Sequence, residues 1–271
     1  MGLLERVQPG GEHVRGQSVS GGETHGAGDA RVGASELALR GEDLGLHALG
    51  EYACVPEGAA VAAPGHLTDE EAATLPIAGV TAWHALFTAG SVGPGQTVVV
   101  QGTGGVSLFA LQLARMAGAR VLVTSRSPAK LERAVALGAA AGIDTRAEPA
   151  WEARVLALTE GRGADHVVDV VGGEGVQRSI AAARVGGTVS LVGFLEGATV
   201  RFDLTRALRR VVRLQAVSVG SRADLEALGR ALGAQGVRPV VDRVFPFEEA
   251  PAAFKYLAEG AHFGKVVVRF P

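Results

Sequence analysis

A glycine-rich turn between a buried strand and a helix most constrains how this chain folds. The apolar, β-branched residues 97–100 have the length of a strand, and the Ala- and Leu-rich residues 108–115 have helical spacing. Gly102 permits the dihedral angles of a sharp turn, and the missing Cβ of Gly104 lets a pyrophosphate approach the backbone. Because free N–H groups and the helix dipole at the helix start favour negative charge, the pattern predicts a dinucleotide cradle.

Ser107 stands where a G-x-G-x-x-G motif has its third glycine, and its hydroxyl could donate to a phosphate. Taken alone, the pattern also fits an ordinary glycine-rich turn. The candidate pyrophosphate-binding residues are Gly102, Thr103, Gly104, Gly105, Val106 and Ser107.

Repeated strand and helix patterns surround this turn. Strand-like runs occur at 120–124, 141–144, 165–171, 187–192 and 213–220, and helical segments at 131–137, 151–158 and 175–184 separate the first four. This alternation predicts an α/β fold with a doubly wound parallel Rossmann sheet. From residue 221 onward, two helices and two strands do not extend the pattern, so we expect the chain to enter a second subdomain there.

Two helices are predicted before the glycine turn. Thr68 and Glu71 form the sequence pattern of a capping box, and residues 80–87 form a buried helix. His84 on that helix is interpreted as a histidine at the edge of the core rather than a catalytic base, since no acidic residue lies within one turn of it.

Composition narrows the function classes. The chain of 271 residues is 47% hydrophobic and has a net charge of −2, which gives no reason to expect nucleic acid or a membrane as a partner. Cys54 is the single cysteine, which excludes an intrachain disulfide and a multi-cysteine zinc site and fits a reducing compartment. We expect a cytoplasmic protein with a small-molecule substrate.

Residues 1–41 are rich in Gly, Ser, Glu and Arg, and we expect this leader to be largely disordered.

The end of the second strand bears on the cofactor. In an NAD site an acidic residue there accepts hydrogen bonds from the ribose hydroxyls. Here the position is Ser125, followed by Arg126 and Lys130, and these side chains would receive a 2′-phosphate that an acid would repel. The pattern favours NADPH, with NADH as the alternative if this is only a solvated turn.

From residue 42 to its end, the chain resembles the medium-chain dehydrogenase/reductase superfamily, in its zinc-type alcohol dehydrogenase and quinone oxidoreductase-like branch. The motifs that carry the resemblance are Gly50-Glu51-Tyr52, Ala72-Ala73-Thr74-Leu75-Pro76, Thr81-Ala82-Trp83, Gly93-Pro94-Gly95, the glycine turn, Lys130-Leu131 and His262-Phe263-Gly264-Lys265. It implies a remnant of a GroES-like β-rich domain at 42–75, a Rossmann NAD(P)-binding domain at 76–215, and a return to the catalytic subdomain at 216–271.

The resemblance also assigns site residues. Thr81 would lie under the nicotinamide, residues 102–107 would hold the pyrophosphate, and Ser125, Arg126 and Lys130 would hold the adenosine ribose. The ribose and carboxamide end would be lined by Val170, Val171, Gly172, Gly193, Phe194, Val219 and Gly220. A homodimer paired through the strand at 213–220 is also implied.

Two departures from the family pattern matter. Ile77 stands where zinc-dependent members have a cysteine ligand, and a Gly-His-Glu motif is absent, so we expect no zinc. The first eighty or so residues of the family have no counterpart, which indicates an N-terminally truncated member. The leading hypothesis is an NAD(P)H-dependent, zinc-independent oxidoreductase that transfers hydride to a quinone, enone or carbonyl substrate, with no catalytic side chain assigned. The alternatives are a nucleotide-binding protein without turnover and, more weakly, a zinc-type alcohol dehydrogenase.

Overall fold

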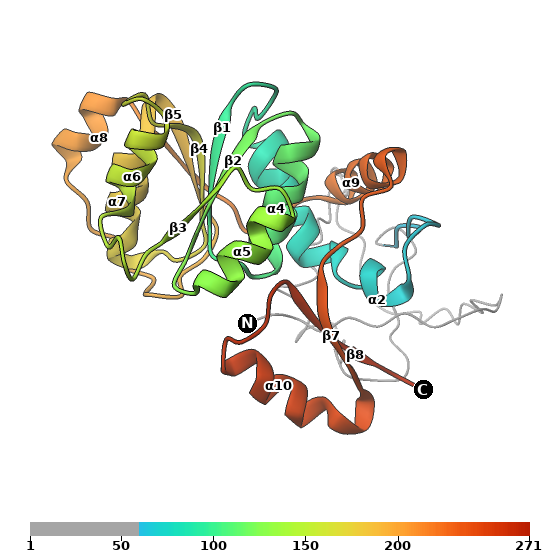
Figure 1. Cartoon of the computed structure of the whole chain (residues 1–271). Helices are drawn as coiled ribbons and strands as arrows, with labels where there is room; N and C mark the ends of the chain where they lie inside the picture. Colours follow the sequence, from blue (N-terminus) through green and yellow to red (C-terminus); the bar gives the residue numbers. More distant parts are fainter. Residues whose placement is uncertain (1–59) are drawn as a thin grey trace, which may run out of the picture.

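The computed structural model describes residues 60–271. The expected leader, the motif at 50–52 and Cys54 lie outside the described residues. Six strands form one parallel sheet in the order β3-β2-β1-β4-β5-β6 (Figure 1). The strands are β1 (Thr97–Gln101), β2 (Arg120–Ser125), β3 (Ala141–Asp144), β4 (Ala164–Asp169), β5 (Ala183–Leu191) and β6 (Arg213–Ala216). The predicted doubly wound α/β fold is confirmed.

Helices cover both faces of the sheet, which explains why β1 and β4 are buried along their whole length (Figure 1). On one face lie α4 (Gly105–Met116) and α5 (Pro128–Ala136), and on the other lie α6 (Trp151–Leu158), α7 (Val176–Ala182) and α8 (Leu204–Arg210). A short η4 turn (Gly173–Gly175) precedes α7. Each face has its own apolar core, one around Phe109 and Leu111 and the other around Trp151 and Val155.

A continuous helical segment leads into the sheet. It comprises α2 (Asp69–Ala72), the π-helical turn η2 (Leu75–Gly79), α3 (Val80–Trp83) and a second π-helical turn, η3 (His84–Thr88). The predicted capping box is confirmed, since Glu71 N–H donates to Thr68 Oγ1 and Thr68 N–H donates to the Glu71 carboxylate. The helix predicted at 80–87 is confirmed as well, with α-helical geometry over Val80–Trp83 and π-helical geometry from His84 onward. Such turns are frequent at functional sites.

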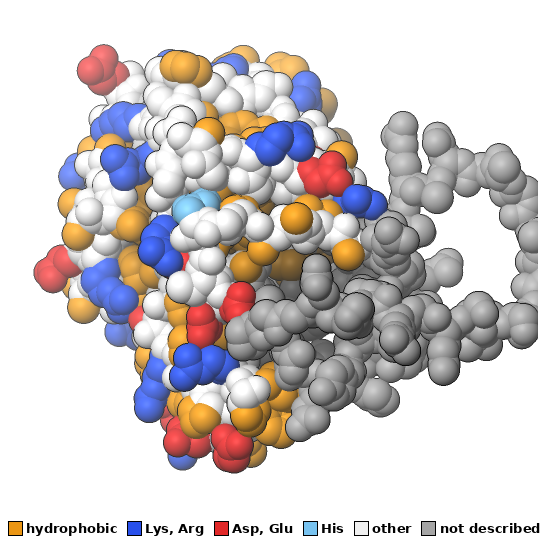
Figure 2. Space-filling view, turned by 90° about the vertical axis from the view of Figure 1, so that its right-hand side faces the viewer, with side chains coloured by type: hydrophobic (Ala, Val, Ile, Leu, Met, Phe, Trp, Pro, Cys, Tyr) orange, Lys and Arg blue, Asp and Glu red, His pale blue; other side chains and the backbone are white. Residues whose placement is uncertain are grey.

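The C-terminal residues form a separate small unit. After α9 (Arg222–Gln235), which packs against α3, come β7 (Val241–Pro246), the turn η5 (Phe247–Glu249), α10 (Ala250–Ala258) and β8 (Lys265–Arg269). β7 and β8 pair as a second, two-stranded parallel sheet. Figure 2 shows this side of the molecule, where acidic and basic side chains are interspersed with hydrophobic ones. Within residues 60–271, no helix is long and apolar enough to cross a membrane.

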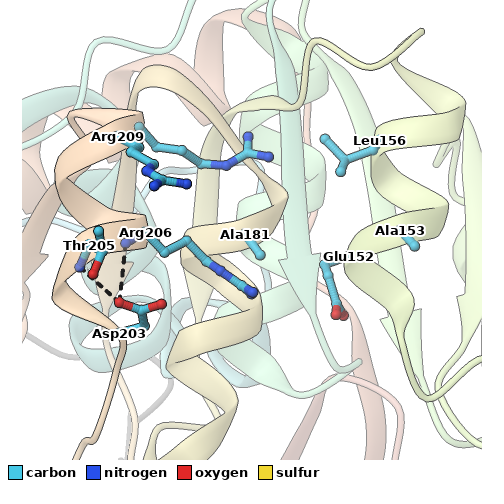
Figure 3. A pocket seen from close by; sticks show the side chains of 9 residues that line it. Glu152, Ala153, Leu156, Ala181, Asp203, Thr205, Arg206 and Arg209 are labelled. Carbon is cyan, nitrogen blue, oxygen red and sulfur yellow. Dashed lines mark hydrogen bonds between the residues drawn. The ribbon is translucent and has the colours of Figure 1, made fainter.

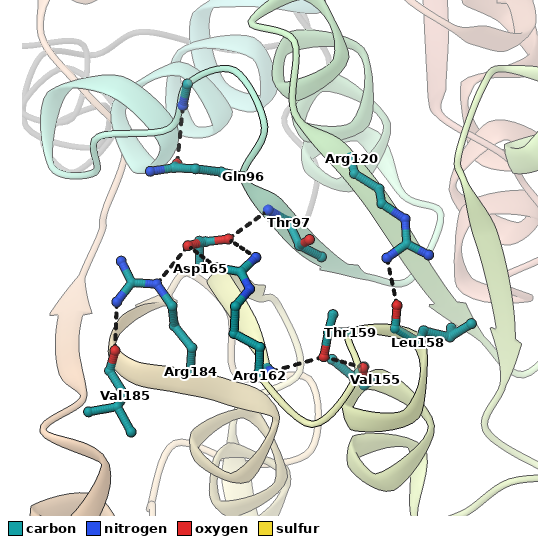
Figure 4. Close-up of polar contacts among 12 residues, drawn as sticks. Gln96, Thr97, Arg120, Val155, Leu158, Thr159, Arg162, Asp165, Arg184 and Val185 are labelled. Atoms are coloured by element: carbon teal, nitrogen blue, oxygen red, sulfur yellow. Dashed lines mark hydrogen bonds and ion pairs between the residues drawn. The ribbon is translucent and has the colours of Figure 1, made fainter.

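An ion-pair cluster joins the strands at the amino end of β4 (Figure 4). Asp165 accepts hydrogen bonds from the Thr97 backbone N–H at 2.8 Å, from both terminal nitrogens of Arg162, and from Arg184 Nε at 2.6 Å. Burial raises the pKa of Asp165, but the Arg162, Thr97 and Arg184 hydrogen bonds outweigh it and bring the pKa down to about 2. Because ligands of such sheets bind at the carboxyl ends of the strands, this cluster is structural.

Candidate functional site

The site lies where the strand order changes direction. β1 is flanked by β2 on one side and β4 on the other, and doubly wound sheets with such a reversal bind ligands in a crevice past the carboxyl ends of the two strands. β1 ends at Gln101 and β4 ends at Asp169, and each strand is followed by a glycine-bearing turn. The glycine turn and the turn at 170–173 therefore share one edge of the sheet.

The glycine turn has the geometry that a pyrophosphate needs. Gly102 has a φ of 73° and its N–H donates to Thr124 O at 2.7 Å, which fixes the turn beside β2. Gly104 is the N-cap of α4, and a Cβ built on it meets no protein atom within 4 Å. Open space therefore lies beside the start of a 12-residue helix, where backbone N–H groups favour an anion.

Ser107 has a different role from the one we expected. Its hydroxyl is buried and donates to Gln101 O at 2.7 Å, so the single hydroxyl proton closes the turn instead of facing a phosphate. The hydroxyl proton is used within the protein here, and a bond from Ser107 to the cofactor stays a prediction. Ser107 replaces a third glycine because its side chain bridges helix and strand.

The C-terminal strand reaches this cradle, which sequence reasoning missed. Gly264 N–H donates to Thr103 O at 3.0 Å, and a Cβ on Gly105 would lie only 2.4 Å from Lys265 Cδ. The aliphatic part of the Lys265 side chain thus lies beside the start of α4. The sequence did offer a signal, since Gly264 and Lys265 belong to the terminal motif of the resemblance.

The end of β2 presents polar and basic groups. Ser125 Oγ accepts the Ser127 N–H at 3.2 Å, and Arg126 is exposed next to it. Lys130 lies one turn into α5, and its Nζ donates to Gly260 O in the C-terminal unit. Burial lowers the pKa of Lys130, although nearby Asp242 opposes this shift. One of the three Lys130 donors is therefore used within the protein, whereas Arg126 points its charge to solvent.

The turns after β4 and β5 lie against each other. A Cβ on Gly172 would lie 2.6 Å from Gly193 O, and a Cβ on Gly193 would lie 2.2 Å from Val170 O. Gly172 also has a φ of 70°, which disfavours any other residue there. The predicted site residues Val171, Gly172, Gly193 and Phe194 are thereby brought together, with Phe194 73% exposed at the surface.

Thr81, Val219 and Gly220 meet around α3. Thr81 is buried, and its hydroxyl donates to Ile77 O at 2.6 Å. A Cβ on Gly220 would lie 2.5 Å from Val80 Cγ1, so the segment after β6 packs directly on this helix. The strand predicted at 213–220 pairs only over Arg213–Ala216.

His84 has an acidic partner that the sequence did not reveal. Its Nδ1 lies 2.9 Å from Asp224 Oδ2, and Asp224 also accepts from Thr88 Oγ1 and caps α9 through Ser221. Asp224 is 140 positions away from His84 in the chain, so no sequence window around His84 contains this acid. The His84 side chain is 29% exposed, at the edge of the core as we expected.

The described residues hold no cluster of three His, Cys, Asp or Glu side chains that could bind a metal. Ile77, at the position of the family's cysteine ligand, lies in η2 one turn before Thr81.

A groove of about 610 Å³ lies elsewhere, between α6, α7 and α8 (Figure 3). Arg206 and Arg209 extend from α8 along one side of it, and Leu156 and Glu152 lie opposite on α6. None of its lining residues belongs to the glycine cradle or to the turns beside it. The groove is therefore distinct from the candidate cofactor site.

Comparisons with known proteins agree with the geometry. Residues 105–234 match the zinc-binding dehydrogenase family. The chain is 42% identical to a zinc-type alcohol dehydrogenase-like protein of Schizosaccharomyces pombe, over 81% of this chain and 65% of that protein. A solved NAD-dependent alcohol dehydrogenase has a TM-score of 0.74 at 34% identity, covering 81% of this chain and 64% of that one. Crotonyl-CoA carboxylase/reductase AntE, solved in complex with NADP, has a TM-score of 0.74 at 25% identity, covering 79% and 60% respectively.

The chain thus spans slightly less than two thirds of the length of these relatives. The matched region begins at Gly105, directly after β1 and the turn at 102–104, and it contains strands β2 to β6 and the helices between them. On these grounds the chain is similar to the zinc-binding dehydrogenase family and to zinc-type alcohol dehydrogenase-like proteins over the sheet and the helices around it.

Proposed function

We propose that this chain is an NADPH-preferring, zinc-independent reductase that transfers hydride to a quinone, an enone or a carbonyl compound. The observation that carries the proposal is the carboxyl end of β2, where Ser125 and the exposed Arg126 stand in place of an acidic residue. The solved neighbours include one named for NAD and one bound to NADP, so the preference has to come from this chain's own residues.

Different groups of site residues would bind different parts of the cofactor. The backbone of residues 102–107 and the start of α4 would bind the pyrophosphate. Arg126 would pair with a 2′-phosphate, for which its planar guanidinium is well suited. The turns at 170–173 and 192–197 would line the other ribose and the carboxamide. The bound cofactor would supply the hydride.

The protein's own part in such a reaction is mainly positioning. Thr81 and Val219 are buried at the α3 side of the crevice and give that wall an ordered surface. Holding hydride donor and acceptor at close range accounts for much of the rate in reactions that need no protein nucleophile. Ile77 offers no zinc ligand to polarise a carbonyl, which favours quinone and enone acceptors.

Turnover assays test the reaction. The purified chain is mixed with NADPH and a panel of quinones, enones and aldehydes, and loss of nicotinamide absorbance is followed with and without a chelator. We expect NADPH to be oxidised at a rate that is the same with and without the chelator. Binding of NADPH without oxidation by any acceptor would favour a nucleotide-binding protein. Activity that the chelator abolishes, with one zinc per chain in metal analysis, would favour a zinc-type alcohol dehydrogenase.

We also propose a homodimer formed through β6. Within residues 60–271 this strand pairs with β5 alone and is the edge of the sheet, and Leu208 and Val211 just before it are 66% and 68% exposed. An unpaired edge next to apolar surface favours association. Light scattering at micromolar concentration should give twice the mass of the chain, and a monomer would contradict this proposal.

A further inference from the structure

The side chain of Asp169 lies at the junction of the three turns that form the candidate cofactor site. It is fully buried at the carboxyl end of β4. One carboxyl oxygen, Oδ1, accepts the backbone N–H of Val171 at 3.0 Å and that of Gly172 at 2.9 Å. The other, Oδ2, accepts the Ser179 hydroxyl at 2.6 Å.

The contacts of Ser179 extend this junction to the glycine turn. Gln101 Nε2 donates to Ser179 Oγ at 2.8 Å and lies 3.4 Å from Asp169 Oδ2. Gln101 immediately precedes Gly102, and its carbonyl accepts the Ser107 hydroxyl. A buried chain of hydrogen bonds thus runs from the glycine turn to the turn at 170–173.

The backbone of Asp169 reaches the third turn. Its carbonyl accepts the N–H groups of Val192 at 2.8 Å and Gly193 at 3.3 Å. The turn after β5 is held in addition by Glu196 N–H to Val171 O at 2.9 Å and by Gly173 N–H to Gly197 O at 3.0 Å. Removing the Asp169 side chain would therefore leave the two turns in contact but free the N–H groups of Val171 and Gly172.

We infer that Asp169 is a positioning residue that fixes the turn at 170–173 for the nicotinamide half of the cofactor without touching the cofactor itself. The inference rests on the proposed cofactor site. Its physical basis is that Gly172 has a φ of 70°, a conformation the two hydrogen bonds to Oδ1 hold in place. A turn that samples other conformations binds its ligand more weakly, because it is ordered only on binding.

The test compares two ligands by calorimetry. NADPH contacts both halves of the site, whereas adenosine 2′,5′-bisphosphate contacts only the adenosine half. In Asp169→Ala we expect NADPH affinity to fall about tenfold, as for the loss of roughly one net hydrogen bond, and bisphosphate affinity to stay within about twofold. Asp169→Asn keeps an oxygen that accepts from Val171 and Gly172, so it should recover most of the NADPH affinity.

Two further variants complete the experiment. Asp165→Asn removes a buried carboxylate at the opposite end of the same strand, and both affinities should stay at the wild-type values. Ser179→Ala removes one donor to Asp169 but keeps the carboxylate that accepts from the turn at 170–173. It should therefore weaken NADPH affinity about threefold and leave bisphosphate affinity unchanged. If Asp169→Ala does not fold, Ser179→Ala decides the question.

Equal weakening of both ligands would assign Asp169 to general stability and overturn the inference, as would unchanged NADPH affinity. If the wild-type chain binds neither ligand, the proposed cofactor site itself is wrong and the inference falls with it. That outcome is recognised in the wild-type titration alone, so the two failures are distinguishable.

Discussion

The carboxylate of Asp165 accepts the backbone N–H of Thr97 at 2.8 Å, so a buried acid at the amino end of β4 holds the first residue of β1 (Figure 4). Arg162 and Arg184 donate to the same two oxygens. β1 carries the glycine turn at its other end. The cluster therefore stabilises the end of the sheet opposite the candidate site.

Replacing Asp165 by Asn should destabilise the fold at neutral pH. The variant keeps an oxygen for Thr97 but leaves Arg162 and Arg184 without their anionic partner. We expect the free energy of unfolding in urea to fall by about 2 kcal/mol, below the cost of breaking a fully buried pair because both arginines are partly exposed. An unchanged free energy would show that solvent screens the cluster completely.

The same carboxylate predicts acid sensitivity. Its pKa in the folded state is about 2, below the ordinary value of 3.8, so the folded state binds fewer protons than the unfolded state between these values. The stabilisation is complete above pH 4 and is lost as the pH falls toward 2, for a total of about 2 kcal/mol. The difference in unfolding free energy between wild type and Asp165→Asn should therefore shrink over this range. A difference in unfolding free energy that does not change with pH would contradict the lowered pKa of Asp165.

His166 predicts a second, separate pH window. It is buried on β4 with Nε2 2.9 Å from Ser190 Oγ, and burial lowers its pKa from 6.5 to about 4. Because the unfolded state takes up the proton first, stability should fall as the pH drops from 6.5 to 4, by about 3 kcal/mol in total. His166→Gln keeps a polar group beside Ser190 and cannot titrate. Urea unfolding of this variant should lose that part of the pH dependence, and an unchanged slope would contradict the prediction.

Gly172→Ala should damage both stability and the site. Its φ of 70° and the 2.6 Å separation of a built Cβ from Gly193 O leave no room for a side chain. We expect a loss of about 2–3 kcal/mol in unfolding free energy. Gly175→Ala is the matched control, since the nearest atom to its Cβ is 3.7 Å away and its φ is −61°. Similar losses in the two variants would refute the steric argument.

Much of the fold was predictable because its signals are local. The β-branched run before Gly102 and the Thr68–Glu71 capping box act within a few residues, and both are present in the structure. The parallel, doubly wound sheet follows from the alternation of strands and helices, because strand–helix–strand connections are almost always right-handed. The predicted end of a strand was wrong where strand pairing stops early. The strand expected at 213–220 ends at Ala216, and the residues after it pack on α3.

The parts that were missed depend on distant contacts. Helix α8 has Leu204, Ala207 and Leu208 at helical spacing, but the segment is short, both leucines are exposed and the helix has no buried residue. The pairing of His84 with Asp224 and the approach of Lys265 to Gly105 join residues more than a hundred positions apart. The Ser107 hydroxyl donates to the Gln101 carbonyl. The spacing of the glycine motif does not tell whether this hydroxyl donates to a backbone carbonyl or to a phosphate.

An acidic residue at the end of β2 should reverse the cofactor preference. In Ser125→Asp a carboxylate would repel a 2′-phosphate and accept hydrogen bonds from the ribose hydroxyls of NADH. We expect NADPH affinity to fall about tenfold or more and NADH affinity to rise or stay level. Ser91→Asp, at an exposed serine before the amino end of β1, serves as a control for charge alone. Equal effects of the two variants would mean that Ser125 does not face the ribose.

The most direct test is a titration of the purified chain with NADPH and NADH, followed by nicotinamide fluorescence, with Arg126→Ala measured alongside. We predict saturable binding of both cofactors, with NADPH tighter by about tenfold in wild type and the difference largely lost in the variant, since one charge-assisted contact to a phosphate is worth about that much. No binding of either cofactor, or tighter binding of NADH by the wild-type chain, would contradict the proposed site.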